Sequence, residues 1–370
     1  MSAALRRNHV TGCYDRATGM MARADRVEKA RIFREEAERE GFPRIGIARA
    51  EPPARFDRFR EWIGAGRHAG MSYLEATAEV RASPARLLPG AASVVCLAAP
   101  HRSEPLRAAD GSLVARYAAG PDYHGNLRKR AIRVVERVSL RLDGPFEWRV
   151  CVDSTPLAER SFAAAAGLGW IGKNGCLIDR ELGSYLLLAE ILTDLDLPPD
   201  DPVAEMCGSC VRCLDSCPTG AFVVPGVLDA ARCLAYWTIE SRGPLPDEVK
   251  MAMGDHVFGC DVCQEACPWN DALARRAGPA SPDDGRAKGT LPTRLEWLGI
   301  GKGEWRRRFG ATALNRAGRR GLQRNAAASA GATGDGAVRP ALAAAAGNPD
   351  RGLADAALWA ARRLAPAPPA

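Results

Sequence analysis

The sequence predicts three parts in chain order: an α/β (α+β) body, a cysteine-rich module and an all-α C-terminal region. Strand-length apolar runs that alternate with helical patterns predict the body, eight closely spaced cysteines define the module, and an Ala-rich repeat predicts the helical region. With 370 residues, 46% hydrophobic and 26% charged, the chain is long enough for two or three domains with buried cores. This composition excludes a disordered or fibrous protein.

The body is predicted to begin after a short extension. Residues 1–24 lack a clear periodicity, and we expect them to be disordered. The expected helices have apolar residues at helical spacing and lie at 25–39, 56–64, 127–142 and 156–168. The expected strands are rich in Val, Ile, Leu and aromatic residues and lie at 44–50, 93–99, 146–153 and 184–192. Helices and strands that share residues 25–200 predict one mixed body, and the order of its strands stays open.

The cysteines indicate the compartment and the chemistry. No apolar run reaches the ~20 residues that span a bilayer, and no secretory signal is recognisable, so we expect a cytoplasmic protein without membrane contact. Cytoplasmic thiols are kept reduced, which favours metal ligation over disulfides for the twelve cysteines. Eight of the twelve lie between Cys207 and Cys267, within a module that we expect to span residues 201–275.

The spacing of these eight cysteines predicts two 4Fe-4S clusters. The first run, CGSCVRCLDSCP at 207–218, has the C-x2-C-x2-C-x3-C-P spacing of bacterial ferredoxins, and the second run, CDVCQEACP at 260–268, lacks one ligand. Cys233 is the only cysteine between the runs and completes the set. With ligands exchanged as in two-cluster ferredoxins, one cluster takes Cys207, Cys210, Cys213 and Cys267, and the other takes Cys217, Cys233, Cys260 and Cys263. Structural zinc is the alternative, but it usually binds two separated C-x2-C pairs.

The C-terminal region, residues 276–370, combines an Ala-rich repeat with positive charge. Ala326, Ala327 and Ala330 recur as Ala356, Ala357 and Ala360, and 338–346 can form the helix between them. This period is typical of HEAT-like repeats, and a plain Ala-rich helical cap is the alternative. Residues 286–370 contain 15 basic and 5 acidic residues, a net charge of +10. Such a region indicates contact with a polyanion or, equally, a solvated Arg-rich surface.

Five motifs resemble those of the epoxyqueuosine reductase family. They are RYAAGPDYH at 116–124, VDSTPLAER at 152–160, GWIGKN at 169–174, CLAYWTIE at 233–240 and CDVCQ at 260–264, and the resemblance covers about residues 25–365. It implies a cytoplasmic, cobalamin-dependent enzyme with two 4Fe-4S clusters, whose cobalamin-binding catalytic domain is residues 25–200. The implied reaction reduces the cyclopentane epoxide of epoxyqueuosine to queuosine at the wobble position of tRNAs with GUN anticodons.

The resemblance implies that Asp153 is the proton donor. Reductive opening of an epoxide needs two electrons and a proton for the departing oxygen, and a carboxylic acid can supply the proton if an apolar site raises its pKa. Asp153 ends an expected strand and precedes a helix with Pro156 in its first turn. The alternative from the residues alone is that Asp153 or Ser154 caps that helix.

The matching motifs also imply residues that contact cobalamin. These are Tyr123, His124, Ser154, Lys173, Asn174, Ser184, Thr238 and Asp261. The string from Asp122 begins like the D-x-H-x-x-G motif that supplies a histidine to cobalt, but Leu127 stands where the glycine is required, so we expect base-off cobalamin without a His ligand. Alternatives are that Lys173 is a surface charge and that Asp261 binds only backbone amides.

For tRNA, we expect contacts from basic residues of the C-terminal region. The candidates are Arg306, Arg307, Arg308, Arg320 and Arg324. Trp297, Trp305 and Phe309 interleave with them and either stack on bases or belong to the core. We further expect a monomer that receives electrons from an unidentified low-potential donor.

Two other functions stay open. A corrinoid iron–sulfur reductase of a small molecule, like the reductive dehalogenases, usually carries a twin-Arg export signal, and the hydrophobic segment of such a signal does not follow Arg6 and Arg7. A ferredoxin-like electron-transfer protein would not need some 200 residues ahead of its clusters.

Overall fold

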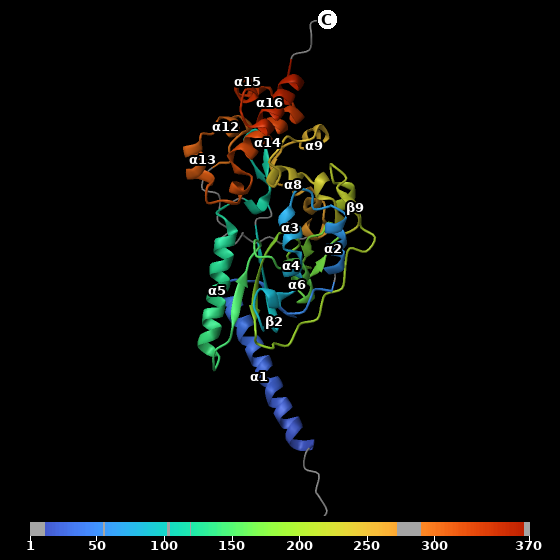
Figure 1. The fold of residues 1–370 in the computed structure, drawn as a ribbon, viewed down its shortest axis with the longest axis vertical. Helices are drawn as coiled ribbons and strands as arrows, with labels where there is room; N and C mark the ends of the chain where they lie inside the picture. Colours follow the sequence, from blue (N-terminus) through green and yellow to red (C-terminus); the bar gives the residue numbers. More distant parts are fainter. Residues whose placement is uncertain (1–11, 55, 102–103, 119, 272–289, 366–370) are drawn as a thin grey trace, which may run out of the picture.

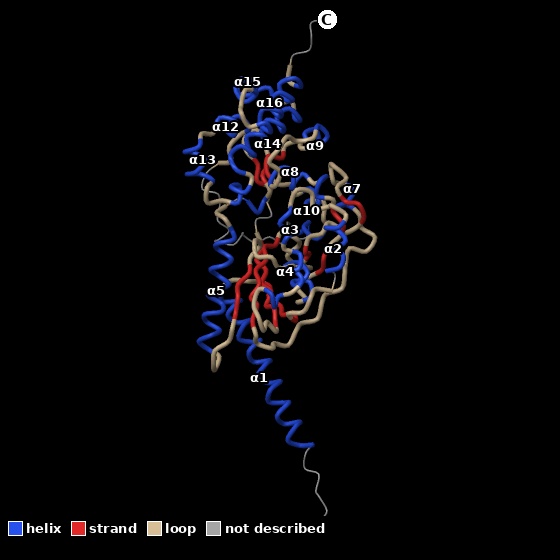
Figure 2. The backbone as a smooth tube through the Cα atoms, in the orientation of Figure 1, coloured by secondary structure: helices blue, strands red, loops and turns tan. Residues whose placement is uncertain are grey.

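The computed structural model describes residues 12–54, 56–101, 104–118, 120–271 and 290–365, with side chains from residue 24 onwards. Figure 1 shows an elongated molecule in which the first half of the chain forms the lower body and the C-terminal helices form the upper end. The long strands gather in the lower body, whereas the upper end is almost entirely helical (Figure 2).

A four-stranded antiparallel sheet forms the centre of the body. Its order is β1 (Arg44–Arg49), β2 (Ser93–Pro100), β8 (Leu186–Thr193) and β5 (Trp148–Cys151). The four predicted strands are confirmed, although β5 is shorter than the predicted 146–153. Because all neighbours run antiparallel, the α+β form of the prediction is correct.

Helices cover both faces of this sheet. On one face, α1 (Gly12–Arg39) and α5 (Tyr123–Arg141) pack against a core that includes Val95 and Ile191. The other face carries Val94 and Leu192 and packs against α6 (Glu159–Ala165). Alternate residues of each strand therefore face different helices, as the two-residue period of a strand requires.

Helix α1 begins earlier than predicted. Residues 12–24 are helical, so the expectation of a disordered extension over 1–24 is wrong for them, and residues 1–11 lie outside the described part of the chain. Figure 1 shows that the first part of α1 projects beyond the body. A projecting helix needs no apolar stripe, which is the feature that would have revealed it in the sequence.

Two other helix starts differ from the prediction in ways that shape the site. Helix α5 begins at Tyr123 rather than 127, because Asp122 caps it by accepting the backbone N–H of His124 at 3.0 Å. Helix α6 begins at Glu159 rather than 156, and its N-cap residue, Ala158, makes no side-chain cap. Asp153 therefore belongs to a turn, and the alternative that it caps the following helix is wrong.

Smaller elements join the body to the cysteine module. In the body they are α2 (Phe56–Gly64), α3 (Ser72–Ala76), α4 (Ala78–Ala82), and β6 (Trp170–Ile171) paired with β7 (Leu177–Ile178). Helix α2 matches the prediction. In the module they are α7 (Arg212–Asp215), β9 (Phe222–Val224) paired with β10 (Val227–Leu228), α8 (Leu234–Ile239), α9 (Asp247–Ala252) and α10 (Val262–Glu265). A three-stranded sheet of β3 (Leu106–Arg107), β4 (Leu113–Val114) and β11 (His256–Phe258) pairs a strand of the module with strands of the body.

The C-terminal part contains α12 (Arg294–Gly299), α13 (Lys302–Phe309), α14 (Gly318–Thr333), α15 (Arg339–Ala346) and α16 (Arg351–Arg363). The two Ala triplets predicted as a repeat are fully buried on α14 and α16, which pack together. A Cβ on Gly331 would lie 2.8 Å from Cα of Ala360, so only glycine fits this contact. The HEAT-like classification stays a prediction.

The aromatic residues of this region belong to its core. Trp297, Trp305 and Phe309 are at most 8% exposed and pack together with Leu314 and Leu322. The interpretation of these rings as core residues is therefore confirmed. None of the helices in the described ranges combines the length and the apolar character that a bilayer span requires.

Candidate functional site

Asp153 lies in a strained turn directly after β5. Its φ of +44° falls in the left-handed region, which non-glycine residues adopt at a cost and mostly at functional sites. Its backbone N–H lowers the pKa of the nearby Glu159 carboxyl group, while its half-exposed side chain accepts the hydroxyl hydrogen of Tyr123. Nε2 of His124 lies 2.8 Å from the same Asp153 oxygen. The first turn of α5 therefore holds this carboxylate in place.

In the pair formed by Asp153 and His124, the proton resides on the histidine. Burial raises the pKa of Asp153, but hydrogen bonds from His124 and Tyr123 outweigh it and the net pKa is lowered. The hydrogen bond to Asp153 is the largest cause that raises the pKa of His124 to about 9, and Asp122 at Nδ1 contributes further. The expectation that an apolar site raises the pKa of Asp153 is wrong, because two hydrogen-bond donors face its carboxylate.

Two further carboxyl groups lie behind Asp153. Glu190 on β8 is 0% exposed, and neither of its oxygens has a hydrogen-bond partner among the described residues. Burial and then the charge of Asp153 raise the pKa of Glu159 to about 7. Neither residue was predicted to have a role, although a lone glutamate in the apolar run 184–192 is a visible signal.

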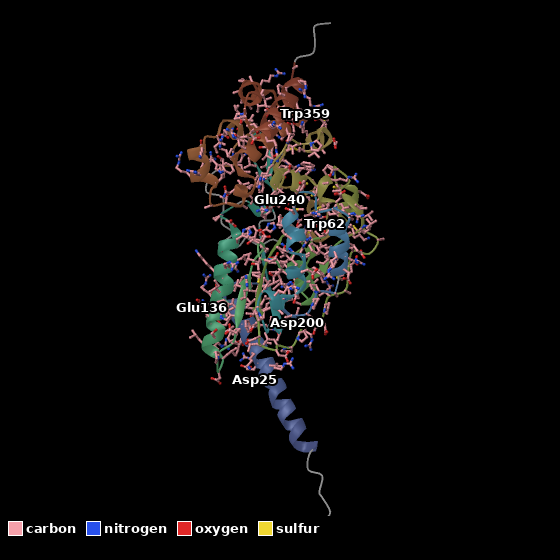
Figure 3. All side chains as sticks on the ribbon, viewed as in Figure 1. Asp25, Trp62, Glu136, Asp200, Glu240 and Trp359 are labelled. Atoms are coloured by element: carbon pink, nitrogen blue, oxygen red, sulfur yellow. The ribbon has the colours of Figure 1, made fainter. Side chains whose placement is uncertain are left out.

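A basic and aromatic rim borders the Asp153 turn. Arg316 pairs with Glu240 at 2.7 Å, and its guanidinium lies 5.7 Å from the ring centre of Tyr73, which is 42% exposed. The charge of Arg316 also lowers the pKa of Asp153. Figure 3 labels Glu240 where the lower body meets the helical end. Tyr73 lies in none of the five motifs, and Glu240, although it ends the motif at 233–240, was not among the predicted site residues.

The thiols of the first predicted cluster surround one cavity. Cys207, Cys210, Cys213 and Cys267 line a space of about 330 Å³. Burial raises the pKa of Cys213, and the other three thiols raise it further, as expected of neighbouring groups. In the described residues, no three His, Cys, Asp or Glu side chains converge closely enough to hold a single metal ion. A cavity of this size with four thiols at its wall fits a 4Fe-4S cluster.

The second predicted set also lies together. Burial raises the pKa of Cys260 to about 12, and Cys233 and Cys217 are close enough to contribute. Burial raises the pKa of Cys263, and the neighbouring thiols of Cys176, Cys260 and Cys233 raise it further. Cys176 therefore lies beside the predicted ligands. All eleven cysteines with described side chains are free thiols.

Two candidate cobalamin residues instead bind the cysteine runs. The ammonium of Lys173 donates to the carbonyl oxygens of Gly208 at 2.6 Å and Cys210 at 3.0 Å. The side-chain amide of Asn174 donates to the carbonyl oxygen of Cys263 at 3.4 Å. Lys173 is thus not a free surface charge, and its contact with cobalamin stays a prediction. The turn that carries both residues connects the body to the two cysteine runs.

Three other candidates are buried and engaged within the protein. Thr238 is 0% exposed; its hydroxyl donates to Leu234 and accepts the backbone N–H of Gly259. The hydroxyl of Ser184 donates to Gln264 at 2.9 Å. The carboxylate of Asp261 accepts the backbone N–H of Arg116 at 2.8 Å, which is the alternative considered for it, and also lies 3.8 Å from the Arg116 guanidinium. The polar atoms of Thr238 and Ser184 are therefore buried and satisfied within the protein, and their contact with a cofactor stays a prediction.

The predicted tRNA-binding arginines divide into two groups. Arg306, Arg307 and Arg308 are exposed on α13, and Arg320 is half-buried and donates to Gln323. Arg324 is only 1% exposed. Its guanidinium donates to the carbonyl oxygens of Trp237, Ser241 and Gly243 at 2.6–3.0 Å. The prediction that Arg324 binds tRNA is wrong, because backbone carbonyls inside the protein occupy its donors.

Arg324→Ala should lower the free energy of unfolding by about 3 kcal/mol or more, because carbonyl groups that lose a charged donor each cost about 1–3 kcal/mol. Arg306→Ala is the matched control and should stay within about 0.5 kcal/mol of the wild type. Urea denaturation measures both variants. Equal stability of the two variants would contradict the structural role of Arg324.

Comparisons with known proteins agree with this geometry. The family described as "Epoxyqueuosine reductase QueG, DUF1730" matches residues 81–154, and the "4Fe-4S double cluster binding domain" matches residues 206–270. The epoxyqueuosine reductase of Xanthomonas campestris pv. campestris is 39% identical over 326 residues, which is 85% of this chain and 90% of that protein. That of Pseudomonas aeruginosa is 38% identical over 333 residues, 87% of this chain and 91% of its own.

Solved structures are similar over most of the chain. A crystal structure of an epoxyqueuosine reductase with an epoxyqueuosine-modified tRNA-Tyr stem loop has a TM-score of 0.82 and 31% identity, covering 90% of this chain and 89% of its own. The enzyme from Bacillus subtilis has a TM-score of 0.80 and 30% identity with the same coverage. In that structure a catalytic aspartate loop is swung out of the active site.

Proposed function

The chain belongs to the epoxyqueuosine reductase family of oxidoreductases, and on this premise we propose that it reduces epoxyqueuosine to queuosine at the wobble position of tRNA with a GUN anticodon. The observation that carries the proposal is the strained Asp153 turn, held by Tyr123 and His124, in a chain that also has two sets of cluster-forming cysteines. A ferredoxin-like carrier would have no use for this turn. The eleven free thiols support a reducing compartment such as the cytoplasm.

We propose two 4Fe-4S clusters with the ligand sets predicted from the spacing. Cys207, Cys210, Cys213 and Cys267 hold the first, and Cys217, Cys233, Cys260 and Cys263 hold the second. A low-potential one-electron carrier protein delivers electrons at the first cluster. The thiols of Cys207 and Cys210 are partly accessible there, and the exposed side chain of Met206 lines the same cavity.

Cobalamin is the proposed second cofactor, and the residues around Asp153 fit it only in part. Of the eight candidates, Tyr123, His124 and Ser154 lie at the surface beside Asp153 and are the ones that would contact a corrin. Both ring nitrogens of His124 face carboxylates and bind protons, so this ring has no free lone pair for cobalt. Bound cobalamin would supply a metal centre that takes electrons from the clusters and acts on carbon.

Residues of the chain itself supply the protons that the reaction consumes. Conversion of an epoxide to an alkene breaks two C–O bonds, consumes two electrons and two protons, and releases the oxygen as water. The Asp153–His124 pair holds one proton at the surface. As the oxygen departs, the proton passes from Nε2 of His124 to the Asp153 carboxylate and then to the oxygen, so Asp153 is the immediate donor.

The test is anaerobic reconstitution of the full chain with iron, sulfide and cobalamin, followed by reduction in the presence of an epoxyqueuosine-containing stem loop. We expect iron and cobalt to be retained together and the nucleoside to lose the mass of one oxygen atom. Zinc at the cysteines, or loss of cobalamin on gel filtration, would contradict the proposal.

Substitution of Arg306, Arg307 and Arg308 by Glu should weaken stem-loop binding and reduce the slope of log affinity against log salt by about three, because each arginine neutralises one phosphate. A backbone hydrogen bond of 3.0 Å from Asp122 to Ala311 sets the end of α13 beside the first turn of α5. The control replaces Arg339, Arg351 and Arg362 by Glu; these arginines are also exposed but lie on other helices. An equal loss of stem-loop affinity in both triple variants would show that α13 is not part of the tRNA interface.

Turnover should fall as the pH rises through about 9, the value to which the pKa of His124 is raised. The protonated ring also stabilises the folded protein below its ordinary pKa of about 6.5, and this contribution is lost as the pH passes about 9. Turnover rates and NMR titration of the ring measure both effects. His124→Asn should abolish the step, whereas His256→Gln should leave it in place. Titration of His124 at its ordinary value would contradict the assignment.

A further inference from the structure

Glu190 occupies an unusual position for a glutamate. It lies on β8, opposite Cys96 of β2 and Cys151 of β5, so strands flank it on both sides. Cys96, Cys151 and Leu192 belong to the core cluster that packs against α6, and Glu190 shares their face by the alternation of the strand. Glu190 is 0% exposed, and both of its oxygens lack a hydrogen-bond partner in the described structure.

This carboxyl group does not serve folding. A buried carboxyl without partners costs several kcal/mol and normally avoids ionisation by keeping its proton. Apart from Thr193 at its end, the other residues of the strand are apolar, so leucine would suit the position; they are Leu186, Leu187, Leu188, Ala189, Ile191 and Leu192. A costly polar group that the fold does not need indicates a functional role.

Glu159 connects Glu190 to the site. It begins α6, which packs against β8, and it lies close enough to Asp153 that the backbone N–H and the charge of Asp153 both act on its pKa. Its Oε1 is inaccessible to solvent and unpartnered among the described residues. Burial, followed by the charge of Glu159, raises the pKa of Glu190, while burial and Asp153 raise that of Glu159 to about 7. Asp153, Glu159 and Glu190 thus form a row from the surface into the sheet, whose inner members are protonated most readily.

The proposed reaction consumes two protons, whereas the Asp153–His124 pair holds one. We infer that Glu159 and Glu190 store the second proton behind Asp153 and deliver it through Asp153 while bound tRNA covers the site. As their side chains turn towards one another, the proton passes from Glu190 to Glu159, from Glu159 to the Asp153 carboxylate, and then to the departing oxygen, which leaves as water. A low-potential electron carrier supplies the two electrons, and solvent restores both protons after product release. Both glutamates are positioning residues, since they act through Asp153, and this inference rests on the proposed function.

Other ionisable groups face this row and bear on its titration. The thiols of Cys96 and Cys151 flank Glu190, and burial raises the pKa of each thiol, so both stay neutral. Arg81 and Arg160 contribute positive charge near Glu159, and His124 lies on the far side of Asp153. The two glutamates are therefore the members of this row that bind protons most readily, and the change in protonation near pH 7 is that of Glu159.

Glu190→Leu and Glu190→Gln test the store in the reconstituted holoenzyme. We expect turnover of the stem loop to fall about 10²-fold in both, the lower end of a proton-transfer contribution, with KM unchanged. The Leu variant should be at least as stable to urea as the wild type. The decline of wild-type turnover as the pH rises through about 7 should be absent from both variants. Glu136→Gln, on the exposed side of α5 and labelled in Figure 3, is the matched control and should behave as the wild type.

Infrared spectroscopy provides a readout that does not depend on activity. The wild type at neutral pH should show the carbonyl stretch of protonated carboxyl groups, and Glu190→Gln should lose the component that Glu190 contributes. Wild-type turnover and pH profile in Glu190→Leu, or absence of that band from the wild type, would overturn the proton store. A wild type that shows the band but does not reduce the stem loop would instead reject the proposed function.

Discussion

Asp153→Asn should lower turnover by about 10²–10⁴-fold, the contribution of a positioned proton donor, while the clusters and the corrinoid stay bound. The amide can still accept the Tyr123 hydroxyl, but it has no charge to pair with His124 and cannot carry a proton to the oxygen. Single-turnover reduction of the stem loop, with iron and cobalt quantified in the same samples, measures the effect. Asp143→Asn, in an exposed loop of the body, is the control.

The same variant also tests where the proton resides. Without the carboxylate, the pKa of His124 should fall from about 9 towards its ordinary value, because the Asp153 hydrogen bond is the largest cause of the increase. NMR titration of the ring follows this change without any cofactor. Normal turnover of Asp153→Asn would reject Asp153 as the donor, and an unchanged His124 titration would reject the pair.

Cys233→Ala should remove the second cluster, about half of the iron and essentially all turnover, because a cluster that loses one of four thiolates is not retained and the electron path is broken. This cysteine is the most informative ligand to change, since it lies outside both regular runs and was assigned as the only cysteine between them. Iron analysis and electron paramagnetic resonance of the reduced protein measure the loss.

Cys176→Ser is the matched control for this assignment. Its thiol lies near Cys263 but belongs to neither predicted set, so the variant should keep all of its iron. Loss of iron from Cys176→Ser together with full retention in Cys233→Ala would show that Cys176, and not Cys233, is the ligand.

The fold was predictable where local pattern and tertiary environment agree. The four long strands are apolar runs rich in Val, Ile and Leu, and each lies near its predicted place. The start of α6 was misplaced because Pro156, a common first-turn residue, here belongs to the turn that holds Asp153. The start of α1 was missed because its projecting part has no core to face.

The site was predictable where covalent spacing determines geometry. Cysteines two or three residues apart must lie close together, and the four thiols of the first predicted set line one cavity. Arg324 and Glu190 illustrate the opposite case. An arginine in a basic run resembles a surface residue until the carbonyls of residues 237–243 fold over it, and a glutamate in a strand reveals nothing of its neighbours on the adjacent strands. Such contacts join residues far apart in sequence.

The turn that carries Lys173 and Asn174 has a mechanical consequence. Two adjacent side chains of one turn attach to Gly208 and Cys210 in the first cysteine run and to Cys263 in the second. One rigid support thereby fixes the separation between the two inorganic centres. Electron tunnelling slows exponentially with distance. Loosening this turn would therefore change the tunnelling rate between the two centres, while the difference between their reduction potentials would stay almost the same.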